Sequence, residues 1–196
     1  QNILYYHSGL YELVMCIFMI LGTLNFGLHF VIMHGNIKEL FKNSEVKTFT
    51  VIMFLISILA IIGLVILNVY PDGIAYARKG LFQIICGITT SGFTNIYSAH
   101  FITLWGGIAI IAIILSMLCG GSINSAAGGI KTLRLNIIFK TIIENIKSTV
   151  YPEGKIIVKK IHHIKDIVVT DKMFKSSAII FICYIALFVI GTIITT

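Results

Sequence analysis

Apolar and polar stretches alternate along the chain in a pattern typical of membrane helices. Four long apolar stretches cover residues 10–33, 48–70, 101–118 and 173–194. An α-helix needs about 20 predominantly apolar residues to cross the ~30 Å hydrocarbon layer of a bilayer. We therefore expect helices of membrane-spanning length in these stretches, and the predicted fold class is an all-α membrane protein.

A fifth apolar stretch, residues 77–88, has only 12 residues and can reach only part of the way across. Small hydroxyl residues and a glycine follow it: Thr89, Thr90, Ser91, Gly92 and Phe93. Backbone that leaves a helix at membrane depth is tolerated only inside protein or along a water-filled path. We interpret residues 77–93 as a half-helix with a re-entrant pore loop. Its partially negative C-terminal end would favour a cation in the middle of the membrane.

A second interruption lies at residues 119–129, where small residues replace the apolar ones and four glycines occur. Glycine is unfavourable inside a helix and permissive outside it. The pattern predicts a flexible break within a longer helical element, with helix resuming at Ile130.

Composition supports the membrane class, because 57% of the residues are hydrophobic and 12% are charged, against roughly 25% charged in soluble domains. The net charge of +7 does not indicate a nucleic-acid partner. All 15 lysines and arginines except Arg78 and Lys79 lie in residues 38–47 and 131–175. This clustering is typical of cytoplasmic loops. Arg78 and Lys79 are expected to be solvated at the outer surface, and Glu12 to lie in the membrane interface, with ion attraction as its alternative role.

The order of elements predicts one complete helix–pore loop–helix unit at residues 48–147. Residues 1–47 then carry the end of a preceding unit and a cytoplasmic loop, and residues 148–196 carry a cytoplasmic linker and the first helix of a following unit. Within the linker, alternation at 156–158 and 167–169 is compatible with short strands or interfacial structure. The adjacent His162 and His163 are expected to point apart.

Two motifs resemble those of the Trk/Ktr/HKT superfamily of potassium transporters. The residues at positions 90–93 resemble its T-x-G-F filter signature. Residues 120–131, together with Arg134, resemble its glycine-rich segment G-G-S-x-x-S-T-A-G-G-I-K-x-x-R, with Ala126 in place of the usual Thr. The long glycine-rich motif is the more specific of the two, and the resemblance covers essentially the whole chain.

The resemblance implies four such units in one chain around a single pore, this chain holding the third unit. It implies that backbone carbonyls bind K⁺, with Na⁺ as a possible alternative cargo. The carbonyls would be those of Thr89, Thr90, Ser91 and Gly92. It also implies an intramembrane gate loop made by Gly120, Gly121, Ser122, Asn124, Ser125, Gly128, Gly129 and Lys131. A homodimer in the cell membrane and a cytosolic nucleotide-binding regulatory subunit are further implications.

Three other functions remain to be weighed. A secondary transporter of another fold would bind a small solute at its half-helices, with half-helix N-termini meeting in the membrane. A phosphate-binding loop lacks the required Gly-Lys-Ser/Thr sequence, because Ile130 separates Gly129 from Lys131. An intramembrane serine protease would need Ser122 beside His29 or His34. We therefore expect a transporter without a cofactor rather than an enzyme.

Overall fold

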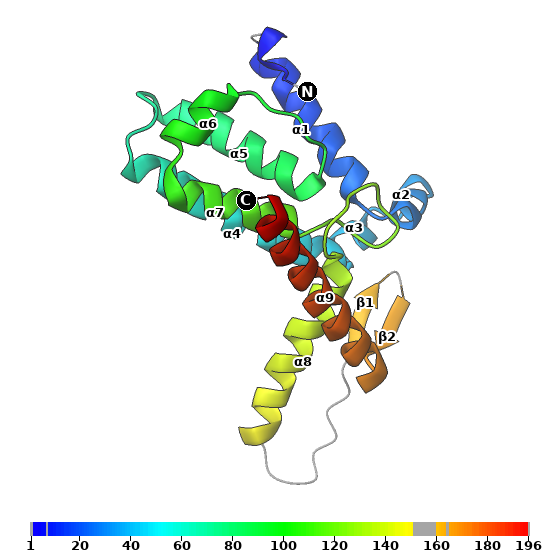
Figure 1. The fold of residues 1–196 in the computed structure, drawn as a ribbon. Coiled ribbons are helices and arrows are strands. Elements are labelled where there is room, and N and C mark those ends of the chain that lie inside the picture. The colour runs from blue at the N-terminus through cyan, green and yellow to red at the C-terminus, as the bar shows by residue number, and fades with distance from the viewer. Residues whose placement is uncertain (1, 7, 151–159, 164, 196) are drawn as a thin grey trace.

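The computed structural model describes residues 2–6, 8–150, 160–163 and 165–195, and these residues are predominantly helical (Figure 1). The first elements in chain order are η1 (Leu4–Tyr6), α1 (Gly9–Thr23), α2 (Phe26–Met33), α3 (Lys38–Lys42), α4 (Ser44–Ile66) and α5 (Gly73–Thr89). The remaining elements are α6 (Ser98–Leu104), α7 (Gly106–Leu118), α8 (Thr132–Val150), β1 (Lys160–His163), β2 (Lys165–Val168) and α9 (Asp171–Thr195).

Helices α4, α5 and α7 pack against one another and form the body of the structure (Figure 1). Their shared core is the apolar cluster of Ile56, Ala60, Ile84 and Ala112. At Gly63 the backbones of α4 and α7 come so close that an added Cβ would lie 2.8 Å from the Ala109 nitrogen. Small residues at a helix crossing allow this approach between membrane helices.

The apolar run at 101–118 is divided rather than continuous, which corrects the expectation of one helix there. α6 ends before Trp105, and α7 begins at Gly106, whose φ of +65° suits glycine. Trp105 is fully buried, and its indole N–H donates to the Tyr70 hydroxyl at 3.0 Å. Burial raises the pKa of the Tyr70 phenol, and the Trp105 hydrogen bond partly opposes that shift.

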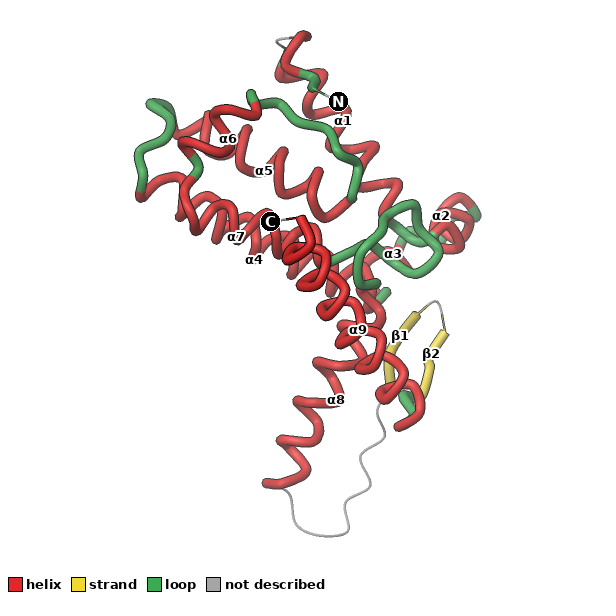
Figure 2. Tube along the Cα trace, in the orientation of Figure 1, coloured by secondary structure: helices red, strands yellow, loops and turns green. Residues whose placement is uncertain are grey.

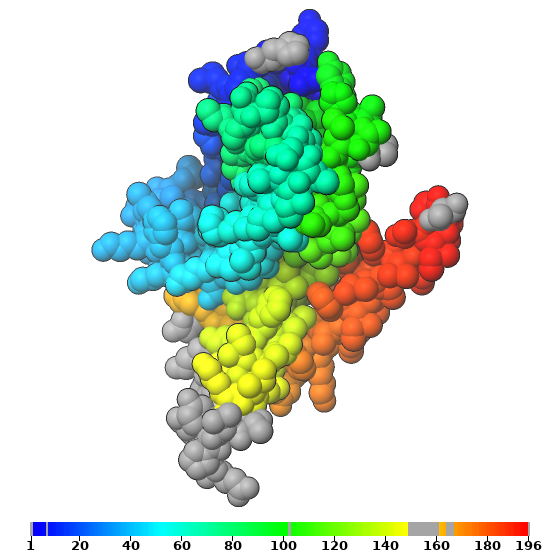
Figure 3. Space-filling view, turned by 90° about the vertical axis from the view of Figure 1, so that its left-hand side faces the viewer, coloured from blue at the N-terminus to red at the C-terminus, as the bar shows by residue number. Residues whose placement is uncertain are grey.

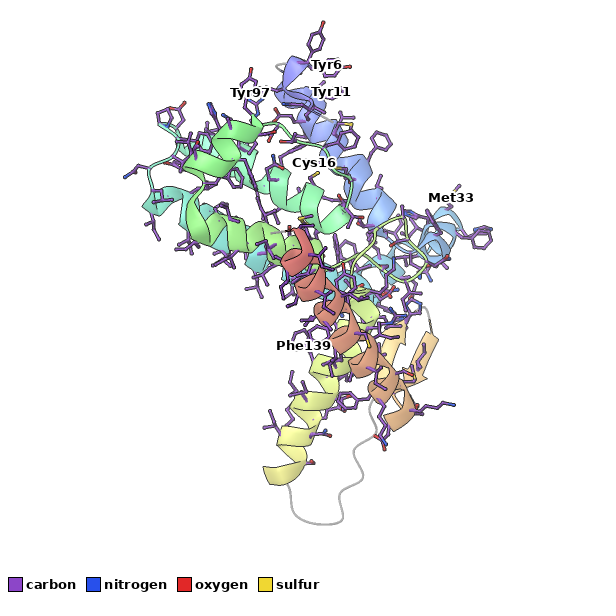
Figure 4. All side chains as sticks on the ribbon, viewed as in Figure 1. Tyr6, Tyr11, Cys16, Met33, Tyr97 and Phe139 are labelled. Carbon is purple, nitrogen blue, oxygen red and sulfur yellow. The ribbon has the colours of Figure 1, made fainter. Side chains whose placement is uncertain are left out.

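The expectation of a single helix over residues 10–33 is wrong. The stretch forms α1 and α2, which are bent by 102° at the break between them. Leu24 and Asn25 have extended backbone, and the Asn25 side chain accepts a hydrogen bond from the Gly27 N–H at 2.7 Å, capping α2. At the far end of α2, the Met33 side chain points away from the body (Figure 4).

The C-terminal part consists of α8, the β1–β2 hairpin and α9. α8 and α9 pack together, and the hairpin is antiparallel with Ile161 opposite Ile167 (Figure 2). The hairpin confirms strand structure at residues 167–168, whereas the alternation at 156–158 lies outside the described residues. His162 and His163 do point apart, toward carboxylates on α3 and α4 respectively.

Among the described residues, α4 and α9 are long and apolar enough to cross a membrane, and the bent pair α1–α2 would make a third span. This confirms a predominantly helical membrane protein that also carries one short hairpin. α9 stands out from the body (Figure 3), and Ser177 is its buried residue. Most apolar side chains of α9 are exposed, whereas Met173 and Phe174 at its start pack against a buried cluster.

Candidate functional site

α5 is shorter than a typical membrane-spanning helix. Its 17 residues extend about 25 Å at 1.5 Å per residue, against a hydrocarbon layer of ~30 Å. The helix begins at Gly73, four residues before the apolar run that marked it in the sequence. It packs against α1, α4 and α7. At Gly87, an added Cβ would lie 2.0 Å from the Ser116 Oγ of α7, so a glycine is required for this packing.

The backbone itself ends α5 at Thr90, which has a left-handed φ of +53°. The Thr90 N–H donates to the Gly87 carbonyl at 3.1 Å, and the Ser91 N–H donates to the Cys86 carbonyl at 3.2 Å. This pair of bonds is the Schellman arrangement that closes helix C-termini. Gly92 follows with φ of +73°, and residues 90–97 then run back along α1 toward α6 (Figure 2).

The side chains at 89–93 hold this loop from within. The Thr89 and Ser91 hydroxyls are 2.5 Å apart. Phe93 packs on the buried cluster of Ile3, Met19, Phe82 and Cys86. The Phe93 carbonyl accepts the Cys86 thiol at 2.6 Å. The five residues thus occupy a defined place between α1 and α5.

The glycine-rich segment is a closed loop whose base is formed by residues on either side of it. The Gly120 N–H donates to the Ile130 carbonyl at 2.9 Å, and the Ile130 N–H donates to the Leu118 carbonyl at 2.9 Å. A Cβ at Gly120 would lie 1.8 Å from the Gly128 carbonyl oxygen. Glycine is therefore a steric requirement there. α8 resumes at Thr132, two residues later than expected.

The loop is seated in the break between α1 and α2. The Ser122 N–H donates to the Thr23 carbonyl and the Ala126 N–H to the Gly22 carbonyl, both at 3.0 Å. In return, the Phe26 N–H donates to the Asn124 carbonyl at 3.1 Å. The break frees the Gly22 and Thr23 carbonyls and the Phe26 N–H from helical hydrogen bonds. The loop supplies partners for all three groups, and these bonds stabilise the break within residues 10–33.

The two sequence motifs meet in space. The Gly128 N–H donates to the Thr90 Oγ1 at 2.8 Å, although these residues are 38 positions apart. A cavity of about 270 Å³ lies between the end of α1, the 89–93 loop and the glycine-rich loop. Thr89, Ser91 and Phe93 line it on one side, and Ala126 and Ala127 on another.

Two polar side chains of the glycine-rich segment, Ser125 and Lys131, bind within it. The Ser125 hydroxyl donates to the Ser122 carbonyl at 2.6 Å, and the Lys131 ammonium donates to the Ala127 carbonyl. Ala126, which replaces the Thr of the related motif, is exposed. These two bonds lie within the segment and add to those that join the loop to other elements.

Glu12 and Arg78 form an ion pair that the sequence pattern does not predict. Glu12 is 6% exposed, and Arg78 binds its carboxylate through two hydrogen bonds of 2.6 Å. The Asn95 amide donates to the same carboxylate at 3.3 Å. The Arg78–Glu12 pair therefore joins α5 to α1. A carboxylate within an apolar run indicates that a partner lies elsewhere in the chain, but the sequence does not show that this partner is Arg78, 66 positions later.

Glu45 was also missed. It lies in the first turn of α4, is fully buried, and its Oε1 accepts the Ile123 N–H of the glycine-rich loop at 3.0 Å. The Asn43 side chain caps the same turn by accepting from the Glu45 N–H at 2.8 Å. The Asn-Ser-Glu sequence signals a helix start, but it gives no indication that the carboxylate faces inward.

The sequence matches a family of known proteins. The family described as "TrkH: Cation transport protein" matches residues 2–196. The chain is 30% identical over 186 residues to the Trk system potassium uptake protein TrkG of Escherichia coli K12, covering 94% of this chain and 36% of that protein. It is 26% identical over 151 residues to TrkH of the same organism, covering 76% of this chain and 30% of that protein.

The crystal structure of the potassium transporter TrkH from Vibrio parahaemolyticus has the same fold. It superposes with a TM-score of 0.81 at 22% identity, over 96% of this chain and 39% of that one. The chain thus spans roughly a third of the length of the curated relatives. Because the family match extends over nearly the whole sequence, the chain belongs to the TrkH family of cation transport proteins.

Proposed function

We propose that this chain supplies one quarter of a potassium-conducting pore, with residues 89–93 as its share of the selectivity filter. Stripping K⁺ of water requires replacement oxygens in fixed positions, which backbone carbonyls provide in potassium channels. The carbonyls of Thr89, Thr90, Ser91 and Gly92 are the proposed ligands. The observation that carries the proposal is a short, packed helix, α5, ending at a glycine-containing loop that touches the second family motif.

The second motif is proposed to be the gate of that pore. Its residues are Gly120, Gly121, Ser122, Asn124, Ser125, Gly128, Gly129 and Lys131. The contact between Gly128 and Thr90, and the cavity shared by the two loops, support a gate next to the filter. A loop held by backbone hydrogen bonds to the α1–α2 break can be displaced without unfolding a helix.

The rest of the pore would come from three further units of the intact protein, arranged around this one. Membrane lipid and those units would cover the outward apolar side chains of α9. Relatives of this chain carry "Trk system" in their names. A homodimer with a cytosolic nucleotide-binding regulatory subunit is the assembly we propose for the intact protein.

Rubidium flux into proteoliposomes tests the filter assignment in the intact protein. We expect passage of Rb⁺ down its gradient, which separates a pore from a solute transporter with half-helix sites.

Gly92→Ser should reduce the K⁺-over-Na⁺ preference by about tenfold, equivalent to ~1.4 kcal/mol. An added Cβ at Gly92 meets nothing within 4 Å, so the change acts through the backbone φ of +73°. Unchanged selectivity would exclude this role for the loop.

A further inference from the structure

The glycine-rich loop has a second attachment, on the side away from the 89–93 loop. Ile123 donates its backbone N–H to Glu45 Oε1 at 3.0 Å, and Glu45 is fully buried at the start of α4. The other carboxylate oxygen lies 3.3 Å from His163 Nδ1, at the end of β1. One carboxylate thus touches both the proposed gate and the hairpin of the linker.

An apolar contact parallels this polar one. The Ile123 side chain packs against a buried cluster that contains Ile161 of β1, together with Leu133 and Ile137 of α8 and Val169 after β2. The same loop residue is therefore tied to the hairpin twice, through its N–H by way of Glu45 and through its side chain by way of Ile161. Figures 1 and 2 show the hairpin beside the lower part of α9.

The geometry of Glu45 suits a holding role. Asn43 fixes the first turn of α4 by accepting the Glu45 N–H, and the Asn136 side chain of α8 donates to the Ser44 carbonyl at 3.2 Å. The carboxylate is therefore held on a rigid helix start while its two partners come from a loop and a two-stranded hairpin. A buried carboxylate that loses a partner is costly, so the three groups favour remaining together.

We propose that Glu45 and His163 are positioning residues that latch the gate loop closed, and that movement of the β1–β2 hairpin releases it. This inference rests on the proposed gate function of residues 119–131. Displacement of the hairpin withdraws His163 from Glu45 and removes Ile161 from the cluster against which Ile123 packs. The Glu45 carboxylate then loses one of its two neighbours, and the loop loses its apolar contact with the hairpin. A conformational change on the cytoplasmic side that moves the hairpin is then transmitted through it to the gate loop.

The chain offers a matched control on the same hairpin. His162 Nε2 lies 3.0 Å from Glu39 Oε2 on α3, a histidine–carboxylate pair of the same chemistry. Neither Glu39 nor His162 contributes to the apolar cluster around Ile123. Glu39→Gln therefore perturbs the hairpin's attachment to α3 while leaving the link to the gate loop in place.

The test measures basal Rb⁺ flux of the intact protein in proteoliposomes without any activator. We expect Glu45→Gln and His163→Ala each to raise basal flux, by up to about tenfold for loss of a charge-assisted contact. The K⁺-over-Na⁺ preference should stay at the wild-type value, because the filter is untouched. The double variant should show less than the product of the two single effects, since both remove the same latch. Glu39→Gln should leave flux near the wild-type level.

Deletion of residues 123–126 separates this inference from the gate itself. If the deletion raises flux but Glu45→Gln and His163→Ala do not, the latch is wrong and the gate stands. If the deletion leaves flux unchanged, the gate assignment fails and the latch fails with it. Should Glu45→Gln prevent insertion into the membrane, His163→Ala decides, because His163 lies on the hairpin and outside the packed helices.

Discussion

At the scale of single residues, close backbone approach at glycines decides how the helices and loops fit. Gly63 and Gly87 bring α4 and α5 against α7, and Gly120 closes the base of the glycine-rich loop. Gly92 serves differently, because its surroundings are open and only its φ of +73° favours glycine. Side-chain volume therefore limits packing at the first three positions, whereas backbone conformation limits the fourth.

Gly87→Ala tests the packing of α5 against α7. The new Cβ would lie 2.0 Å from Ser116 Oγ and 3.2 Å from Ser116 Cβ, so either the Ser116 hydroxyl must leave its hydrogen bond to the Ile113 carbonyl or the helices must move apart. Overpacking of this kind costs about 1–3 kcal/mol. We expect a lower thermal unfolding temperature for the detergent-solubilised intact protein. Adding Ser116→Ala should recover part of the loss.

Gly107→Ala is the control for this prediction, since a Cβ there meets nothing within 4 Å. It should leave the unfolding temperature nearly unchanged. Equal destabilisation by both substitutions would show that the effect is not specific to the Gly87–Ser116 contact.

At the scale of elements, the Arg78–Glu12 pair joins α5 to α1, the two helices on either side of the 89–93 loop. Arg78→Gln leaves the Glu12 carboxylate buried with the Asn95 amide as its remaining described partner. We expect destabilisation of about 1–3 kcal/mol, less than for a fully buried pair, because the Arg78 side chain is 44% exposed. Thermal unfolding of the intact protein measures it.

The double variant Glu12→Gln/Arg78→Gln should lose less stability than Arg78→Gln alone, because it removes the unpaired charge. Lys79→Gln is the neighbouring control. The Lys79 ammonium lies 4.4 Å from the centre of the Tyr70 ring, a contact of modest strength. A larger loss from Lys79→Gln than from Arg78→Gln would contradict the role assigned to the Arg78–Glu12 pair.

The sequence predicts elements whose determinants are local and misses those set by distant partners. Hydropathy places α4 and α9 well, and glycine content predicts the break after Leu118, because these signals lie within each segment. The α1–α2 bend is different. Its carbonyls at Gly22 and Thr23 are stabilised by N–H groups about a hundred positions later, so only Asn25 hints at it locally.

The same reasoning applies to the candidate site. The residues of the two motifs are recognisable from sequence, but the hydrogen bond between Gly128 and Thr90 depends on the packing of α5, α7 and α1. Glu45 reads as an ordinary helix-start residue, and only the structure places its carboxylate against Ile123. Long-range polar contacts of this kind leave no periodic trace in a single sequence.

At the scale of the whole molecule, the central question is the path of the chain through the membrane. The basic segments at 38–47 and 131–175 favour one side of the membrane for both the α2–α4 connection and the hairpin linker. α4 then carries the chain to the other side, where α5 begins. If α5 enters the membrane only part of the way and the loop at 89–97 returns to the same surface, then α6 begins on that second side of the membrane.

Cysteine labelling of the intact protein tests this path directly. In a background without Cys16, Cys86, Cys119 and Cys183, single cysteines are placed at three exposed positions, Asn36, Asp72 and His100. A membrane-impermeant thiol reagent applied to intact cells should label positions 72 and 100 but not 36. A permeant reagent should label all three, which controls for reactivity. If α5 crosses completely, position 100 lies with 36 rather than with 72, and neither the filter nor the gate assignment survives.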